Sequence, residues 1–288
     1  MIAKLVDDFL LSLRARHLSP NTEADYKRTL GRFVGFIGTG ADPAAVTTKQ
    51  VEIFLASFKH LSPKTVQNMY IGLSAFWSWL LANEYTTAQI MQKIKRPKAT
   101  PPPVIPFTEV EIRRILDAIG RRPMLRACVY LLLDTAARAS ELRDLDIGDI
   151  DLRKGEINIR HGKGEKGRVV PFSQSTGQHV AKYLATRADR QKPDAPLLIA
   201  TTGARLDRRR LTNQLQNLGK RAGVAHVHPH RFRHTAATMM LKNGMDVYSL
   251  QAILGHASLT TTKRYISLAQ IDVEQAHRRA SPVDNWRL

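Results

Sequence analysis

The chain has 288 residues, 43% of them hydrophobic and 24% charged, and a formal net charge of +19. Length and composition are those of a globular protein with room for two domains of ordinary size. So large an excess of positive charge excludes a surface on which acidic and basic side chains balance, and it indicates a polyanionic partner. Nucleic acid is favoured over an anionic membrane as that partner.

Cysteine usage and the N-terminus predict a soluble protein of the cytoplasm. Cys128 is the one cysteine in the sequence, so an intramolecular disulfide is impossible, and its apolar neighbours indicate a small core residue. Asp7 and Asp8 interrupt the apolar N-terminus, which argues against a signal peptide. No apolar run approaches the roughly 20 residues that a membrane span requires, so we expect no membrane partner.

A helical bundle is expected in residues 1–95. Ser19 and Ser62 each stand directly before a proline, which is the pattern of a serine N-cap with proline at the first helical position. Apolar residues recur at helical spacing after both serines. Further helices at about 2–16 and 48–58 would complete a bundle of four.

Residues 96–106 form the predicted boundary between two domains. Five prolines in these eleven residues exclude a regular element and favour an extended, semi-rigid tether. Arg96 and Lys98 suit a strap that crosses a phosphate backbone, although a plain linker is equally allowed.

The second domain, residues 107–288, is predicted to be mainly helical with a small antiparallel sheet. A capping box begins its first helix, and a strongly apolar second helix follows at about 123–137. Residues 156–160 and 168–172 alternate as strands do, and a glycine-rich hairpin joins them.

Other basic residues are candidate DNA contacts. Arg28 and Lys64 lie on polar faces of the N-terminal bundle, and Lys166 lies in the predicted hairpin. Arg208 and Arg210 belong to a run of three arginines that begins a later helix, where at most two could reach one groove. A solvated surface explains any single residue, but together on so basic a chain they favour a DNA-facing surface.

Arg138 and Lys163 are candidate ligands of an anion. Small neighbours leave the Arg138 guanidinium free to reach a ligand, but a helical ion pair with Glu141 explains it equally well. Lys163 lies between two glycines near the tip of the predicted hairpin. Taken alone, a generic basic loop is the simpler interpretation of Lys163.

The densest collection of reactive side chains lies in residues 228–265. His230 and Arg233 are three positions apart and therefore share a face of a predicted helix. His234 follows His230 by four, which is a spacing that zinc sites also use. Neither an HExxH motif nor a cysteine pair supports a metal, so we expect no metal site and a packed, hydrogen-bonded His234. His256 then follows Leu-Gly, and Tyr265 comes nine residues later.

Four motifs in this order resemble those of the tyrosine recombinases, also called the phage integrase family, and most of all the compact Xer-like members. The motifs are residues 135–142, 162–164, 230–234, and 254–256 with Tyr265. The resemblance covers the whole chain, because a helical core-binding domain and a proline-rich linker also belong to the family plan. Ala136 and Ala137 depart from the common Gly-Leu, and residues 266–267 depart from the Thr-His that is common in Xer proteins.

The resemblance implies a two-domain DNA clamp with a SAM-like N-terminal bundle and a mainly α catalytic domain. Its activity would be strand cleavage and rejoining at recombination sites through a covalent 3′-phosphotyrosyl link, without ATP, metal or other cofactor. The nucleophile would be Tyr265. The activating residues carried over by the resemblance are Arg138, Lys163, His230, Arg233 and His256.

The resemblance also implies partners and a location. We expect a tetramer, homomeric or formed with a second recombinase, on double-stranded DNA of the nucleoid. The tail from residue 272 is expected to contact a neighbouring protomer, although packing on its own domain is also allowed. Two alternatives share parts of the pattern: a type IB topoisomerase, and a DNA-binding protein without catalysis.

Overall fold

The computed structural model describes residues 1–16, 18–99, 105–160 and 167–255, and the single positions 258, 259, 262, 265, 277, 281, 283 and 286. The chain divides into two compact units, Met1–Pro103 and Val104–Leu288. The division falls within the proline-rich stretch 96–106. Each unit is described by itself below.

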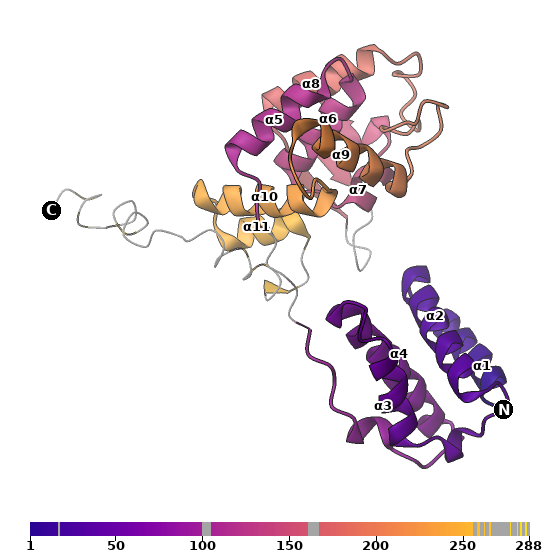
Figure 1. The fold of residues 1–288 in the computed structure, drawn as a ribbon. Coiled ribbons are helices and arrows are strands. Elements are labelled where there is room, and N and C mark those ends of the chain that lie inside the picture. Colours follow the sequence, from indigo (N-terminus) through magenta and orange to yellow (C-terminus); the bar gives the residue numbers. More distant parts are fainter. Residues whose placement is uncertain are drawn as a thin grey trace. The chain divides into compact units, whose positions relative to one another are not determined.

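The described part of the first unit is a bundle of four α-helices (Figure 1). These are α1 (Ile2–Ala15), α2 (Pro20–Ile37), α3 (Thr48–Ser57) and α4 (Pro63–Ala82), with short 3₁₀ turns η1 (Pro43–Ala45) and η2 (Ile90–Lys93). Both predicted serine caps are confirmed. Ser19 accepts from the backbone N–H of Thr22, and Ser62 accepts from that of Thr65. Each such cap contributes about 1 kcal/mol.

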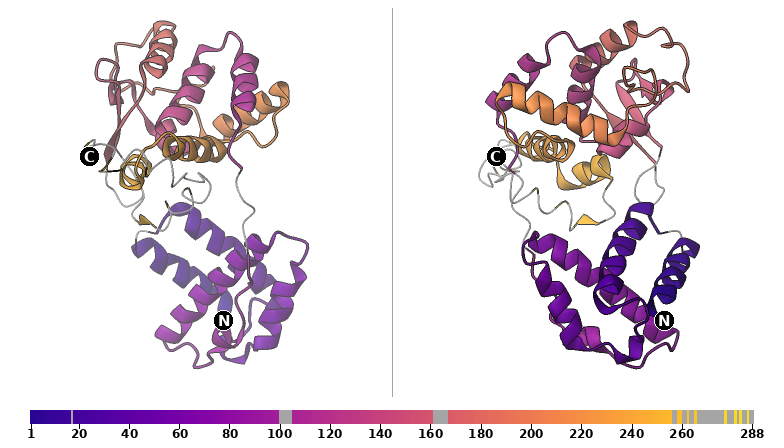
Figure 2. Two further views of the ribbon diagram at one scale, coloured as in Figure 1. Left: turned by 90° about the vertical axis from the view of Figure 1, so that its left-hand side faces the viewer. Right: turned by 45° about the vertical axis from the view of Figure 1, so that its right-hand side comes forward.

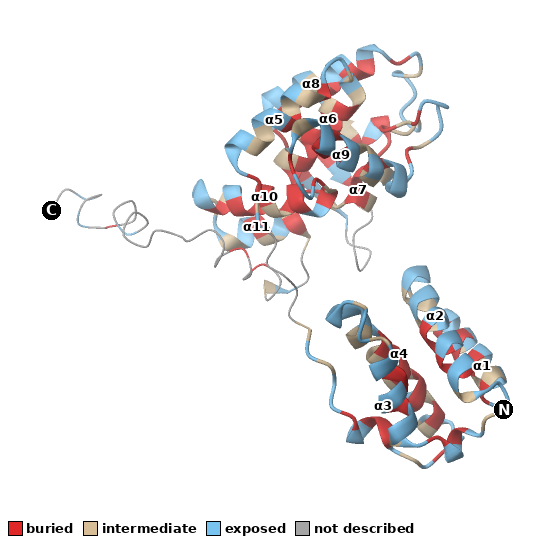
Figure 3. Cartoon of the chain, viewed as in Figure 1, coloured by how far each residue is buried: buried red, intermediate tan, exposed pale blue. Residues whose placement is uncertain are grey.

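Aromatic side chains fill the core of the bundle. Phe33 meets Phe54 edge to face, with ring centroids 5.1 Å apart, and Trp77 packs against Phe33 in the same way. Trp77 is buried, and its indole N–H donates to the carbonyl of Ala88 at 3.2 Å. Buried residues recur along one side of each helix and alternate with exposed residues on the other side (Figure 3).

The second unit combines helices with a small sheet, as predicted. Its elements are α5 (Glu109–Ile119), α6 (Pro123–Thr135), α7 (Ala139–Asp144), η3 (Ile147–Asp149), β1 (Ile150–Asp151), β2 (Glu156–Ile159), β3 (Arg168–Pro171), α8 (Gln174–Ala185), α9 (Arg208–Ala222), α10 (Pro229–Lys242) and α11 (Val247–Leu254). The described strands form one antiparallel sheet in the order β1-β2-β3. The two-residue strand β1 was not predicted, because two residues are too few to show an alternating pattern.

Helix α6 lies at the centre of this unit, packed against α8 and α10. Cys128 is fully buried in α6, and burial raises the pKa of its thiol to about 12, which confirms a core role. Helices α10 and α11 lie side by side (Figures 1 and 2), and α11 also contacts β3. No helix among the described residues combines the length and apolar character that crossing a membrane requires.

Candidate active site

A sharp corner between α6 and α7 positions Arg138. The predicted helix at 123–137 ends earlier, at Thr135, because Ala136 takes the left-handed conformation with φ 51° and ψ 23°. That conformation costs a non-glycine residue on the order of 1 kcal/mol. The Thr135 hydroxyl donates to the Leu131 carbonyl at 2.6 Å and accepts from the Ala137 N–H at 3.3 Å. The corner lets a new helix begin with Arg138 as its N-cap.

Arg138 forms the ion pair with Glu141 and also keeps access to solvent. Its backbone N–H donates to Glu141 Oε2 at 2.7 Å and its Nη1 donates to Oε1 at 2.6 Å. The Arg138 side chain is 25% exposed, whereas that of Glu141 is 3% exposed. Since a guanidinium carries five N–H donors, this pair and a bound anion are compatible. The two interpretations that the sequence left open therefore do not exclude each other.

Arg233 is buried on α10 and holds two helix ends together. Its Nη1 donates to the carbonyl of Ala136 and its Nη2 to that of Leu254, both at 2.8 Å. These carbonyls lie at the C-terminal ends of α6 and α11, where a cation is favoured. Burial, followed by the charge of Arg138, lowers the pKa of Arg233 to about 10. The guanidinium is therefore still charged at neutral pH.

The other arginine of the same motif has a structural task. Arg231 is buried, and its Nη2 lies 3.0 Å from both carboxylate oxygens of Glu111. Its Nε donates to the Ile105 carbonyl, and its guanidinium lies 3.9 Å from the ring centroid of Phe107. These contacts hold the N-terminal turn of α10 against the start of the second unit. The two arginines of this motif therefore have different roles: Arg231 stabilises the fold, whereas Arg233 belongs to the candidate site.

Glu141 is the anionic centre of the site. Within the described residues it meets three guanidinium groups: Arg138, Arg168 at 2.9 Å on both oxygens, and Arg233 at 3.9 Å. Burial alone would raise the pKa of Glu141, but hydrogen bonds from Arg168 and Arg138 hold it at about 2. Three cations against one carboxylate leave a net charge of +2, which suits an anionic ligand.

Arg168 was not among the predicted site residues. It begins strand β3, and its side chain is only 11% exposed. A basic residue beside a glycine-rich hairpin resembles an ordinary exposed strand end in sequence. The signal that could have found it is Glu141 itself, because a carboxylate predicted to lie between small and apolar residues needs a partner once it is buried.

His230 lies one turn before Arg233 on α10, and its side chain is exposed. Partial desolvation by its neighbours, and then the charges of Arg208, Arg233 and Arg138, lower the pKa of His230. Neutral imidazole therefore predominates at neutral pH, and it can accept a proton. The same charge interactions show that His230 lies near Arg138, Arg233 and Arg208.

Tyr265 is helical and buried, with 4% of its surface exposed. It belongs to a small apolar cluster with Ala136, Leu250 and Leu254, among others. Its ring centroid lies 5.2 Å from that of His234, which confirms a packed His234. Tyr265 also contributes to the electrostatic environment of Arg233. The described structure thus brings Arg138, His230, Arg233 and Tyr265 to one region, whereas Lys163 and His256 lie outside the described residues.

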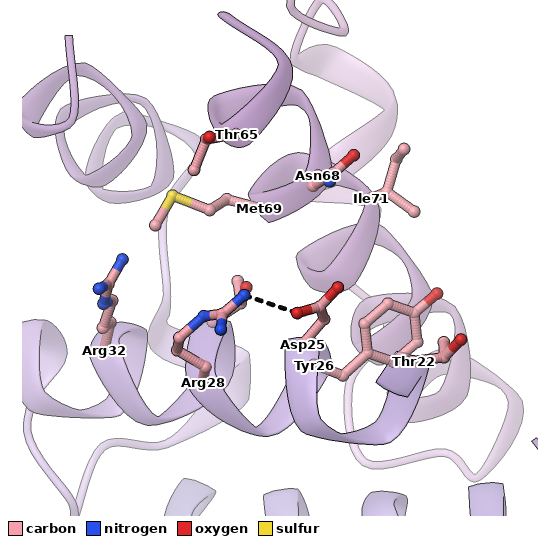
Figure 4. A pocket seen from close by; sticks show the side chains of 10 residues that line it. Thr22, Asp25, Tyr26, Arg28, Arg32, Thr65, Asn68, Met69 and Ile71 are labelled. Atoms are coloured by element: carbon pink, nitrogen blue, oxygen red, sulfur yellow. Dashed lines mark hydrogen bonds and ion pairs between the residues drawn. The ribbon is translucent and has the colours of Figure 1, made fainter. Parts of the chain in front are cut away.

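Arg28, one of the two DNA candidates of the N-terminal bundle, lines a groove of about 310 Å³ between α2 and α4. Arg28 and Arg32 project from α2 and face Thr65 and Met69 of α4 across it (Figure 4). Arg28 pairs with Asp25 three residues before it. On α4, Lys64 donates to Gln67 at 2.8 Å. All of these positions except Met69 keep access to solvent.

The remaining candidates differ in what surrounds them. Arg96 and Lys98 are exposed, and the carbonyl between them, that of Pro97, accepts from Gln67 at 2.9 Å. Arg208 and Arg210 are exposed at the first turn of α9. Lys166 lies outside the described residues. Among the described residues, no group of three or more histidine, cysteine or acidic side chains could hold a metal ion.

Comparison with known proteins agrees with this arrangement. The sequence profile of the phage integrase family matches residues 106–271, and that of the phage integrase N-terminal SAM-like domain matches residues 5–87. Tyrosine recombinase XerA of Pyrococcus furiosus is 31% identical, and the match covers 98% of this chain and 96% of the relative. The chain therefore belongs to the phage integrase family.

Within that family it is a Xer-like tyrosine recombinase, a site-specific enzyme that cleaves and rejoins DNA. Two solved structures share its fold at low identity. The Tn1549 transposon integrase in complex with transposon right end DNA has a TM-score of 0.79 at 19% identity, covering 96% of this chain and 99% of that one. The lambda integrase tetramer bound to a Holliday junction has a TM-score of 0.75 at 16% identity, covering 90% and 78%.

Proposed function

We propose that Tyr265 is the nucleophile of this recombinase. Its phenolic oxygen attacks a DNA phosphodiester, forms a 3′-phosphotyrosyl bond and releases a 5′-hydroxyl. The observation that carries this assignment is the convergence of Arg138, His230 and Tyr265 around Arg233, which itself lies 3.9 Å from the Glu141 carboxylate. A buried phenol beside a cluster of net positive charge is suited to becoming a phenolate during attack.

Arg138 and Arg233 stabilise the transition state. A phosphodiester carries one negative charge, and a pentacoordinate transition state gathers a second on its non-bridging oxygens. The net charge of +2 around Glu141 matches that final charge. Because Arg233 is fixed by the carbonyls of Ala136 and Leu254, its charge is in place before the DNA arrives.

His230 and Lys163 move protons. A phenol with an ordinary pKa of about 10 is protonated at neutral pH, so attack requires a base. His230 is neutral because its pKa is lowered, and it takes the proton from Tyr265. By the family resemblance, Lys163 protonates the departing 5′-oxygen and His256 donates a further hydrogen bond to the phosphate. The phosphotyrosyl bond conserves the bond energy, so the 5′-hydroxyl of a partner strand can reverse the attack.

DNA contacts extend over both units. We assign residues 1–95 to a core-binding domain, 96–106 to a linker and 107–288 to the catalytic domain. The relatives are described as complexes with transposon DNA and as a tetramer on a Holliday junction. Their assemblies support a tetramer on DNA here. By the family resemblance alone, the protein acts in the cytoplasm and its C-terminal tail contacts a neighbouring protomer. The proposed DNA contacts are Arg28, Lys64, Arg96, Lys98, Lys166, Arg208 and Arg210.

The decisive experiment captures the covalent intermediate. Adducts of the full chain mapped across the replicon of its host identify the cleaved sequence, and a nicked suicide duplex with that sequence then traps the adduct. Tyr265→Phe is expected to bind this duplex with unchanged affinity and to form no adduct. An adduct from the Tyr265→Phe variant overturns the assignment. Exchange between two such sites, rather than relaxation of one plasmid, separates recombination from topoisomerase activity.

A further inference from the structure

We infer that Arg168 is a positioning residue of the recombinase: it occupies the Glu141 carboxylate so that Arg138 and Arg233 keep donors for the DNA phosphate. This inference rests on the proposed roles of Arg138 and Arg233. Arg168 does not itself need to touch DNA. Its contacts within the described structure account for the role.

Arg168 makes the most complete contact with the carboxylate. Its Nη1 and Nη2 each donate to a different oxygen of Glu141 at 2.9 Å, which is the bidentate arrangement that arginine and carboxylate prefer. The Arg138 guanidinium, in contrast, uses Nη1 alone on Glu141, while the Arg138 backbone N–H donates to the other oxygen, and Arg233 stays 3.9 Å away. Arg168 is also less exposed than Arg138, with 11% of its side chain exposed against 25%.

A third contact fixes the direction of the Arg168 side chain. Its Nε donates at 2.7 Å to the carbonyl of Ile253, in the last turn of α11. Gly255, the residue that ends α11, leaves the room for this approach. A Cβ on Gly255 would lie 2.8 Å from Nη1 of Arg168 and 3.0 Å from its Cζ. Two features therefore favour glycine at position 255 of the Leu-Gly-His motif: the space that the Arg168 guanidinium occupies, and the left-handed φ of 61°.

Arg168 joins three parts of the site. It begins β3, it holds Glu141 in the first turn of α7, and it holds the C-terminal end of α11. Arg233 reaches the next carbonyl of the same helix end, that of Leu254. Arg168 and Arg233 therefore share the end of α11, while Arg168 and Arg138 share Glu141.

Removal of Arg168 would redistribute the remaining arginines. Glu141 is buried, and a buried carboxylate without its main partner attracts any cation within reach. Arg138 is already in contact and Arg233 is 3.9 Å away. Both arginines would turn further toward Glu141. The N–H donors that they then give to Glu141 would no longer be available to bind the DNA phosphate. The expected consequence is slower chemistry with DNA binding intact.

A double-substitution cycle on the full chain tests this mechanism. Single-turnover adduct formation is measured on the suicide duplex at saturating enzyme, together with DNA affinity and thermal unfolding. Arg168→Met is expected to slow adduct formation by tenfold or more, with DNA affinity changed by less than about twofold. In the Glu141→Gln background, the same Arg168→Met substitution is expected to change the rate by less than about threefold, because the competing charge is gone.

The matched control is Arg160→Met. Arg160 follows β2 on the other side of the same hairpin, and its ion pairs in the described structure are with Asp149 and Asp146 rather than with Glu141. Its substitution is expected to leave the rate within about twofold. Arg168→Lys, which keeps the charge, is expected to recover part of the loss and serves if Arg168→Met does not fold.

The outcomes separate the two proposals. A wild-type rate in the Arg168→Met variant, or losses that multiply in the double variant, overturns the positioning role while the nucleophile assignment stands. If the wild-type chain forms no adduct through Tyr265, the proposed function fails first. Equal losses in Arg168→Met and Arg160→Met would show that only the hairpin fold was disturbed, which also overturns the inference.

Discussion

The Nη1 nitrogen of Arg233 donates a hydrogen bond of 2.8 Å to the carbonyl oxygen of Ala136, 97 positions earlier in the chain. This carbonyl is available because Ala136 turns left-handed and ends α6. The same guanidinium reaches the Leu254 carbonyl at the end of α11. A residue assigned to bind the phosphate thus also joins two helices, so its substitution should affect both catalysis and stability.

Arg233→Ala and Arg138→Ala are expected to separate these effects. Each should slow adduct formation on the order of 10²-fold or more, by analogy with the loss of an oxyanion donor. Arg233→Ala should in addition destabilise the fold by about 1–3 kcal/mol, because two buried carbonyls lose their donor. Single-turnover rates and thermal unfolding of both variants check this. Near-full cleavage by either variant would mean that the substituted arginine does not stabilise the phosphate in the transition state.

The left-handed corner at Ala136 can be tested with glycine. Ala136→Gly removes a buried methyl group but relieves a conformation that costs alanine on the order of 1 kcal/mol. Its neighbour Ala137 is equally buried and lacks the positive φ. We therefore expect Ala136→Gly to be more stable than Ala137→Gly by about 1 kcal/mol in denaturant unfolding. Equal stabilities would contradict the strain at Ala136.

Gly255→Ala should disturb the site more than the fold. Its Cβ would displace the Arg168 guanidinium, which lies 2.8 Å away, so adduct formation should slow by tenfold or more. Gly223→Ala is the matched control, because Gly223 ends α9 with a φ of 64° and a Cβ there meets nothing within 4 Å. Both variants should lose about 1 kcal/mol of stability. A Gly223→Ala variant that is as slow as Gly255→Ala would refute the steric explanation.

The pH dependence of cleavage should report His230. Desolvation and the charges of Arg208, Arg233 and Arg138 lower its pKa. The neutral, proton-accepting form of His230 therefore persists at pH values below the ordinary pKa of histidine. The single-turnover rate should fall as the pH drops through that lowered pKa and not before. Arg208→Gln removes one lowering charge and should move this acidic limb to higher pH. An acidic limb that does not move in Arg208→Gln, measured at saturating DNA, would exclude His230 as the base.

The groove between α2 and α4 should contribute to affinity. Arg28→Ala is expected to weaken DNA binding and to lower the slope of log affinity against log salt by about 0.9, as for one lost phosphate contact. Arg113→Ala is the control, because Arg113 forms a similar exposed pair with Glu109 on α5. Titrations of DNA with each variant at several salt concentrations give the two slopes. The same change of slope in both variants would place Arg28 outside the DNA surface.

Local signals explain what the sequence could predict. The caps at Ser19 and Ser62 and the helices that follow depend on residues within a few positions of one another. The four motifs likewise predicted Arg138, His230, Arg233 and Tyr265 as candidate site residues, and the described structure places these four in one region. The fold class was confirmed as mainly helical with a small antiparallel sheet.

Long-range pairings explain what it could not predict. Arg168 and Glu141 are 27 positions apart, and nothing in the local pattern around Arg168 indicates that it is buried. The sequence predicted that the helix would end at residue 137, two residues after its observed end at Thr135. Alanine is a strong helix former, so Ala136 and Ala137 gave no sign of a left-handed turn. Such features depend on packing between distant segments, as the Arg233 contact with Ala136 does.

Burial of Cys128 has a practical consequence for experiments on this recombinase. With a thiol pKa of about 12, roughly one molecule in 10⁵ carries the thiolate at pH 7. Since Cys128 is the one cysteine in the sequence, the native chain should behave toward maleimide dyes as if it had none. A cysteine introduced at an exposed position of α2 would then be a unique labelling site, and strand exchange could be followed by fluorescence in single complexes.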